Sequence, residues 1–122
     1  MILRTGVDLI ETSRVAEAIG RHGERFLSRV FTELERKECH GRIPSLAARF
    51  AAKEAAAKAL GCGIGDVSWL EIEVRSDERK APFLVLYGEG NRLAKQLGLV
   101  TWSVSLSHTE SHAIAFIVAT GE

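Results

Sequence analysis

Two acidic residues that lie far apart in the chain are the strongest candidates for chemistry. Asp8 stands near the end of an expected strand over residues 2–10, where a carboxylate is uncommon because Asp is depleted in β-strands. It is either a turn-former or a ligand, and taken alone the turn explains it well. Glu54 lies in the segment 45–60, whose many alanines predict a helix. Each carboxylate therefore needs support from its neighbours.

Cations accompany Glu54 along the same helix. Helical spacing places Glu54 beside Lys58 and Arg49 near Lys53, because positions four apart share a face. The plain alternative is a solvated ion pair between Glu54 and Lys58, which stabilises a surface helix very little. Alanine at the surrounding positions disfavours that alternative. Three cations and one carboxylate on an alanine-lined helix suit a site that holds a polyanion and a metal.

A glycine-rich stretch, GCGIG at 61–65, follows this helix. Successive free amides can cradle an anion, which makes Gly63 and Gly65 candidate phosphate ligands. The stretch lacks the Gly-Lys-Ser/Thr of a P-loop, and it follows a helix instead of opening one. By itself it is a weak indication.

A histidine ends the apolar face of an expected strand over 100–107. A histidine in the position of His108 is more often a satisfied structural residue than a catalytic one. Together with His112 it could indicate a metal pair, but their spacing gives a common face only on a helix. Here it spans a turn, so we do not predict a zinc site.

A row of arginines is predicted along the first helix. Arg14, Arg21 and Arg25 are spaced seven and four residues apart, so they can line one helical face. Gly20 and Gly23 can interrupt that face, and an ordinary solvated helix is the alternative. In a chain of zero net charge, such a row suits the docking of an acidic helix, where charge complementarity mainly raises the association rate.

Nine segments with a regular pattern must position these residues. A helix over 13–29 is broken by Gly20 and Gly23, and Thr32 with Glu35 forms a capping box. The long helix follows Pro44, with Ser45 as its N-cap and Gly61 after its end. A strand is expected from about 70, with Leu70, Ile72 and Val74 on one face and Glu71 and Glu73 on the other. A hairpin loop at 76–80 connects it to a strand over 82–87. A helix over 89–97 and strands over 100–107 and 112–118 complete the expected elements.

The order β-ααα-ββ-α-ββ predicts an α+β fold, with a small antiparallel sheet and a long central helix. The 122 residues indicate a single domain, 1–122. Sixteen basic and 16 acidic residues cancel, so bulk charge favours neither nucleic acid nor membrane as a partner. The two separated cysteines fit free thiols in a reducing cytosol, and no segment is typical of a signal peptide or a membrane span. We expect a cytoplasmic protein.

Several of these motifs, in their order, resemble the holo-[acyl-carrier-protein] synthases of the 4′-phosphopantetheinyl transferase family. The matching blocks are GVDLIE at 6–11, ERF at 24–26, FTELE at 31–35, RFAAKEA at 49–55, KALG at 58–61, GIG at 63–65 and SLSHT at 105–109. The resemblance spans nearly the whole chain. The early aspartate combined with the Lys-Glu-Ala helix is its most specific part.

The resemblance implies an enzyme of fatty acid biosynthesis and lipid metabolism. It would transfer the 4′-phosphopantetheine arm of coenzyme A to a serine of apo-acyl carrier protein and release adenosine 3′,5′-bisphosphate. Family members are trimeric, with coenzyme A bound between subunits, so we expect a homotrimer. Acyl carrier protein would be the acidic partner of Arg14, Arg21 and Arg25.

The resemblance also implies a role for each candidate residue. Asp8 and Glu54 would bind Mg²⁺, and Lys58 would contact the phosphates and could protonate the leaving group. Asp8, directly or through a metal-bound water, is the expected general base, with Glu54 as the alternative. Further coenzyme A contacts would come from Arg49, Gly63, Gly65, His108 and Thr109. Two other functions remain open: a non-catalytic oligomeric binding module of the same fold, and another Mg²⁺-dependent nucleotide-binding enzyme.

Overall fold

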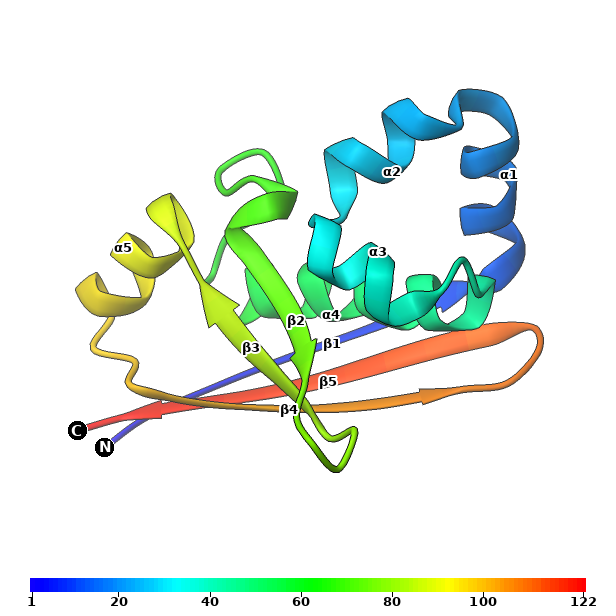
Figure 1. Ribbon diagram of the computed structural model, residues 1–122. Coiled ribbons are helices and arrows are strands. Elements are labelled where there is room, and N and C mark those ends of the chain that lie inside the picture. The colour runs from blue at the N-terminus through cyan, green and yellow to red at the C-terminus, as the bar shows by residue number, and fades with distance from the viewer.

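A long helix packed on a three-stranded antiparallel sheet forms the centre of the molecule (Figure 1). The computed structural model describes all residues, 1–122. The sheet contains β1 (Ile2–Glu11), β5 (His112–Gly121) and β4 (Thr101–His108), in the order β1-β5-β4. The helix, α4 (Ile43–Ala59), lies against β1 and β5. All the helices cover one face of this sheet (Figure 1).

Small side chains let α4 approach the sheet closely. Most of its alanines are fully buried, and so are alternate residues of β5 from Ala113 to Ala119. On β1 the closest approach is at Gly6, where any side chain would collide with the carbonyl oxygen of Ala55. The position of β1 against the middle of α4 therefore depends on a residue without a Cβ.

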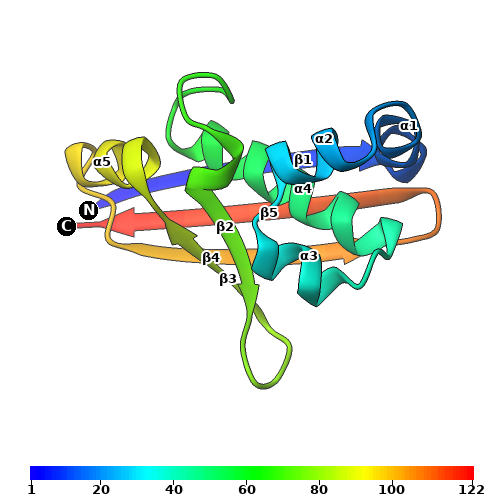
Figure 2. The same ribbon diagram turned by 45° about the horizontal axis from the view of Figure 1, so that its top comes forward.

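A second, two-stranded sheet lies over the same side of the molecule (Figure 2). It consists of β2 (Ile72–Ser76) and β3 (Pro82–Leu86), preceded by the 3-10 helix η1 (Trp69–Glu71) and followed by α5 (Gly88–Gln96). The α+β class, the antiparallel pairing and the long central helix are confirmed. The strands form two sheets instead of one.

The segment before α4 contains three helices, α1 (Thr12–His22), α2 (Glu24–Val30) and α3 (Glu33–Cys39). Gly20 lies inside α1 and does not break it, whereas Gly23, with φ +53°, separates α1 from α2. The predicted single helix over 13–29 is therefore two, and the order begins β-αααα. The capping box of Thr32 and Glu35 is confirmed.

Two expected boundaries are wrong. The helix α4 begins at Ile43, so Ser45 is inside it and Pro44 sits in the first turn, where its missing N–H would have no partner anyway. Leu70 belongs to η1 and is exposed instead of facing the core. Glu73 lies on the strand face opposite Ile72 and Val74, where it is buried and its carboxylate accepts hydrogen bonds from Arg75 and Tyr87.

Both cysteines are free thiols. Burial raises the pKa of the Cys39 thiol to about 11, so this residue stays protonated at neutral pH. None of the helices has the length and apolar character needed to cross a lipid bilayer.

Candidate active site

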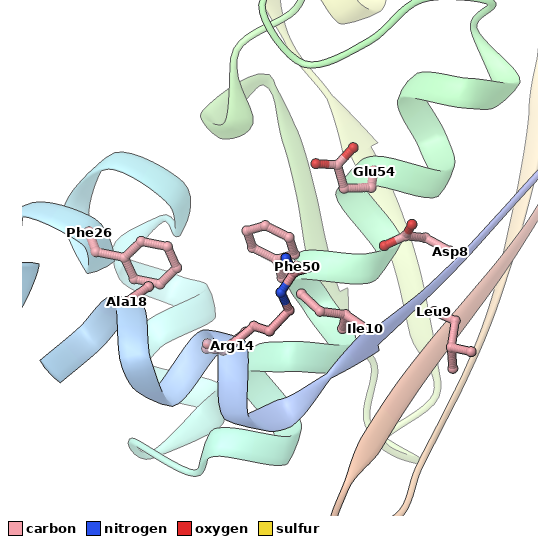
Figure 3. A pocket seen from close by; sticks show the side chains of 9 residues that line it. Asp8, Leu9, Ile10, Arg14, Ala18, Phe26, Phe50 and Glu54 are labelled. Carbon is pink, nitrogen blue, oxygen red and sulfur yellow. The ribbon is translucent and has the colours of Figure 1, made fainter. Parts of the chain in front are cut away.

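Asp8 and Glu54 line the same pocket, although 45 residues of chain separate them. The pocket has a volume of about 400 Å³ and lies between β1, α1, α2 and α4. Figure 3 shows both carboxylates at one end of it, with Arg14 and the ring of Phe50 nearby. The remaining lining is mostly apolar, including Phe26 from α2. The pocket therefore combines an acidic end with an aromatic wall.

The fold holds these two carboxylates together against their mutual repulsion. Burial and the charge of Asp8 raise the pKa of Glu54, while Lys58 partly opposes the shift. Two like charges in one pocket disfavour the ionised state of at least one of them. A bound cation would remove this penalty.

Lys58 is the cation nearest to the acidic end. Its Nζ donates to the carbonyl oxygen of Val7 at 3.0 Å and to Asp8 Oδ1 at 3.4 Å. The Lys58 side chain is 55% exposed and that of Asp8 is 21% exposed. Glu54 has no such partner: its carboxylate faces the pocket and forms no ion pair with a lysine or arginine side chain.

The donor set fits a hard divalent cation. Mg²⁺ is usually bound by one or two carboxylates and completes its shell with water and substrate phosphates. Asp8 and Glu54 supply such a pair. The structure contains no cluster of three or more His, Cys, Asp or Glu side chains that could enclose a metal by itself, so water and a substrate would have to supply the other ligands.

Lys53 does not belong to this site, contrary to the expectation that three cations of the long helix act together. Its side chain is fully buried, and its Nζ donates to Glu35 Oε1 at 2.8 Å and to the carbonyl oxygens of Trp69 and Ile72. Glu35 also accepts from the backbone N–H of Val74. Every donor of Lys53 is used inside the protein, so it cannot contact a bound anion.

Arg49 and His108 meet in a second cleft of about 690 Å³ that has no apolar lining residue. Arg42 and Lys80 also line this cleft; neither belongs to a recognisable motif, so neither was predicted. The cleft is separate from the pocket of Asp8 and Glu54, since the two share no lining residue.

The remaining candidates for coenzyme A contacts lie outside both of these cavities. The N–H of Gly63 faces Asp66 Oδ2 at 3.4 Å, and the N–H of Gly65 donates to the Val67 carbonyl oxygen. These amides are therefore engaged within their own loop. Thr109 is in the exposed turn after β4, where its Oγ1 accepts from the N–H groups of Ser111 and His112.

The predicted arginine row is divided between two helices. Arg14 and Arg21 lie on α1, but Arg25 lies on α2 beyond the break at Gly23. Arg14 reaches the pocket of Asp8 and Glu54. Arg25 instead lines a neighbouring cavity of about 220 Å³ with His22, Arg29 and Phe26, the last of which also lines the pocket of Asp8 and Glu54. His22 and Arg29 were not predicted: the proximity of His22 to Arg25 depends on the turn between the helices, whereas Arg29 follows Arg25 by four residues on α2, and helical spacing could have identified it.

Comparison with known proteins identifies relatives over the whole chain. The model of the 4′-phosphopantetheinyl transferase superfamily matches residues 4–117. The chain is 50% identical to a holo-[acyl-carrier-protein] synthase of Herpetosiphon aurantiacus, with 98% of this chain and 100% of the relative covered. It is 42% identical to one of Koribacter versatilis, with 97% and 98% covered.

Solved structures of the same kind of enzyme share the fold. Helicobacter pylori holo-[acyl-carrier-protein] synthase, in complex with coenzyme A, superposes with a TM-score of 0.87 at 31% identity, covering 95% of this chain and 99% of that one. A holo-(acyl-carrier-protein) synthase from Bacillus anthracis, in complex with CoA (3′,5′-ADP), gives 0.79 at 34% identity, covering 98% and 96%. Sequence and fold agree, and the chain belongs to the 4′-phosphopantetheinyl transferase superfamily as a holo-[acyl-carrier-protein] synthase, a transferase of phosphopantetheine.

Proposed function

We propose that this chain, as one domain, uses Mg²⁺ bound by Asp8 and Glu54 to transfer 4′-phosphopantetheine from coenzyme A to a serine of apo-acyl carrier protein. The serine oxygen bonds to the phosphorus of the transferred group, the bond from that phosphorus to the bridging oxygen breaks, and adenosine 3′,5′-bisphosphate leaves. The observation that carries this proposal is the meeting of the two carboxylates in one pocket beside Lys58. The transfer reaction of the family involves a diphosphate, and we propose that the diphosphate and its metal bind at the acidic end of this pocket.

The residues of the pocket can serve different steps of the reaction. Mg²⁺ would neutralise the charge that builds on the bridging oxygen as the P–O bond breaks. Lys58 is largely exposed beside Asp8, so its ammonium group can turn to the phosphates and protonate the leaving group. Asp8 is the proposed acceptor of the serine proton. Glu54, which faces the same pocket, is the alternative acceptor.

Arg49 and His108 are proposed to bind phosphate groups of coenzyme A, and Thr109, in the turn directly after His108, is a further proposed contact. Their cleft is lined only by polar and charged residues, as a phosphate site requires. It shares no lining residue with the pocket of Asp8 and Glu54. We therefore propose that one coenzyme A molecule uses the acidic pocket of one subunit and the polar cleft of a neighbour. Gly63 and Gly65 remain proposed contacts only if the loop rearranges to release their amides.

A homotrimer is the proposed assembly, as in the family. The face of the three-stranded sheet that carries no helix presents a group of large apolar side chains to solvent: Leu3, Val7, Leu9, Ile114 and Phe116 are 62%, 49%, 63%, 39% and 45% exposed. A contiguous apolar surface of this kind is typical of a protein–protein interface. A Phe116→Glu variant should therefore lower the molar mass measured by light scattering, and an unchanged mass would remove this face from the interface.

The carrier protein is proposed to dock near Arg14, Arg21 and Arg25. All three are exposed, and Arg14 lines the pocket where the transfer would occur. An acidic helix placed there would bring its serine to the metal end of the pocket. We also propose that the reaction serves fatty acid biosynthesis and takes place in the cytoplasm.

The decisive assay is the mass gain of apo-acyl carrier protein incubated with the chain and coenzyme A. We expect a gain of one phosphopantetheine with Mg²⁺ and none with EDTA. No gain under either condition would favour a non-catalytic binding module. Calorimetric titration with coenzyme A and with ATP separates the other alternative, because a nucleotide enzyme of a different kind would prefer ATP.

A further inference from the structure

The carboxylate of Glu38 lies in the polar cleft, where its charge is unexpected. This cleft is proposed above to hold phosphate groups, and a negative charge repels them. Glu38 also occupies the last turn of α3, where the helix dipole disfavours a carboxylate. Neither the ligand nor the helix explains the residue, so its role must come from its contacts.

Glu38 connects three elements through one oxygen atom. Its Oε1 accepts from Arg49 Nη1 at 2.9 Å and from the backbone N–H of Ser76 at 3.2 Å. Arg49 is on α4, and Ser76 ends β2 immediately before the loop that supplies Asp77, Glu78 and Lys80 to the cleft. The side chain of Glu38 is 25% exposed and that of Arg49 only 9%.

The guanidinium of Arg49 is held on several sides. Nη1 also donates to the carbonyl oxygen of Val74 at 2.6 Å, and Nη2 donates to Ser76 Oγ at 3.1 Å. These bonds use three of the donors and leave the others without a partner in the chain. The planar group is thereby fixed in one orientation, which lowers the entropy lost when it binds an anion.

We propose that Glu38 is a positioning residue: it orients Arg49 and anchors the loop after β2, so that the polar cleft is formed before a phosphate group binds. This inference rests on the proposed binding of coenzyme A phosphates by Arg49. A positioning role of Glu38 and a purely electrostatic role predict different effects of its substitution on anion binding. If only its charge mattered, removing it would strengthen anion binding and moving it slightly would change little.

The test is calorimetric titration of the whole protein with adenosine 3′,5′-bisphosphate. We expect Glu38→Asp, which keeps the charge but shortens the side chain, to weaken binding about fivefold. Glu38→Gln, which can still accept both hydrogen bonds, should bind within about twofold of wild type, or more tightly. Glu78→Ala is the matched control, because Glu78 lines the same cleft without a side-chain hydrogen bond; it should bind at least as tightly as wild type.

The ¹⁵N signals of the Arg49 guanidinium provide a second readout that does not depend on any ligand. They should show slow hydrogen exchange in wild type and Glu38→Gln, and faster exchange in Glu38→Asp. Wild-type binding together with a Glu38→Asp variant that binds as tightly as wild type and shows the same slow exchange would overturn the positioning role alone. Failure of the wild type to bind the nucleotide would overturn the assignment of the cleft, and this inference with it.

Discussion

Lys53 and Glu54 are consecutive residues of α4 and have opposite surroundings. Lys53 is fully buried, and each of its donors has a partner in Glu35, Trp69 or Ile72. Glu54 faces a pocket, and its nearest charged neighbour inside it, Asp8, has the same sign. A satisfied charge holds elements together, whereas a charge left without its counterpart marks a place for a ligand.

The largest effect is expected when the buried ammonium group of Lys53 is removed. Lys53→Met leaves the carboxylate of Glu35 buried without its cation, and we expect a loss of about 3–5 kcal/mol in the free energy of unfolding. Urea denaturation measures the loss. Lys58→Met is the control on the same helix, because Lys58 is mostly exposed, and it should change stability by less than about 1 kcal/mol. Equal losses in the two variants would contradict a structural role for Lys53.

Glu54→Gln, in contrast to Lys53→Met, should lower the activity and leave the fold intact. The substitution removes a ligand charge and hardly changes the volume, so we expect activity to fall about a hundredfold or more while the protein remains folded. The mass-gain assay measures the first effect and circular dichroism the second. Glu33→Gln, on the exposed surface of α3, is the control, because Glu33 lies outside both the pocket and the proposed docking face of α1. Activity near that of wild type would exclude Glu54 as a metal ligand.

Arg14→Glu tests whether the aromatic side of the same pocket meets the carrier protein. We expect the apparent KM for the carrier protein to rise about tenfold at low salt and less at high salt, because exposed charges are screened. Lys95→Glu is the control, since α5 lies at the other end of the molecule from α1 (Figure 1). An unchanged KM in Arg14→Glu would remove this residue from the interface.

The smallest expected effect is on thermal stability. Burial and Asp8 raise the pKa of Glu54 in the folded state, so the stability contribution of its protonated form is present at low pH and lost as the pH rises through that pKa. Without metal, Glu54→Gln should therefore melt roughly 1–2 °C above wild type at pH 8. The difference should disappear near pH 4. A variant that melts below wild type at pH 8 would contradict the unfavourable pairing of Asp8 and Glu54.

Local sequence rules predicted those parts of the fold that depend on local interactions. The capping box of Thr32 and Glu35, the alanine-rich α4 and the left-handed Gly61 follow from neighbouring residues, and the structure contains them. Pro44 was misplaced because proline both ends a preceding segment and fits a first helical turn. That ambiguity moved the predicted start of α4 by two residues.

Helical spacing and other local patterns could not predict the long-range contacts. Helical spacing put Lys53 near Arg49, but it could not show that Glu35 and Glu38 of α3 pair with them. The buried Glu73 and the aromatic contact between Phe50 and Trp69, whose ring centroids are 4.6 Å apart, likewise depend on tertiary packing. The presence of Asp8 and Glu54 in one pocket is a geometric finding, and their catalytic roles stay predictions.

Binding of Mn²⁺, followed by electron paramagnetic resonance in the presence of coenzyme A, shows whether Asp8 and Glu54 hold one metal ion between them. Asp8 and Glu54 should act as one site, so wild type should bind a single tight Mn²⁺ per chain. Both Asp8→Asn and Glu54→Gln should weaken that binding by about tenfold or more, because each removes one of the two ligand charges. Glu33→Gln should bind as wild type does. Equal Mn²⁺ affinity in all four proteins would contradict a metal held between β1 and α4.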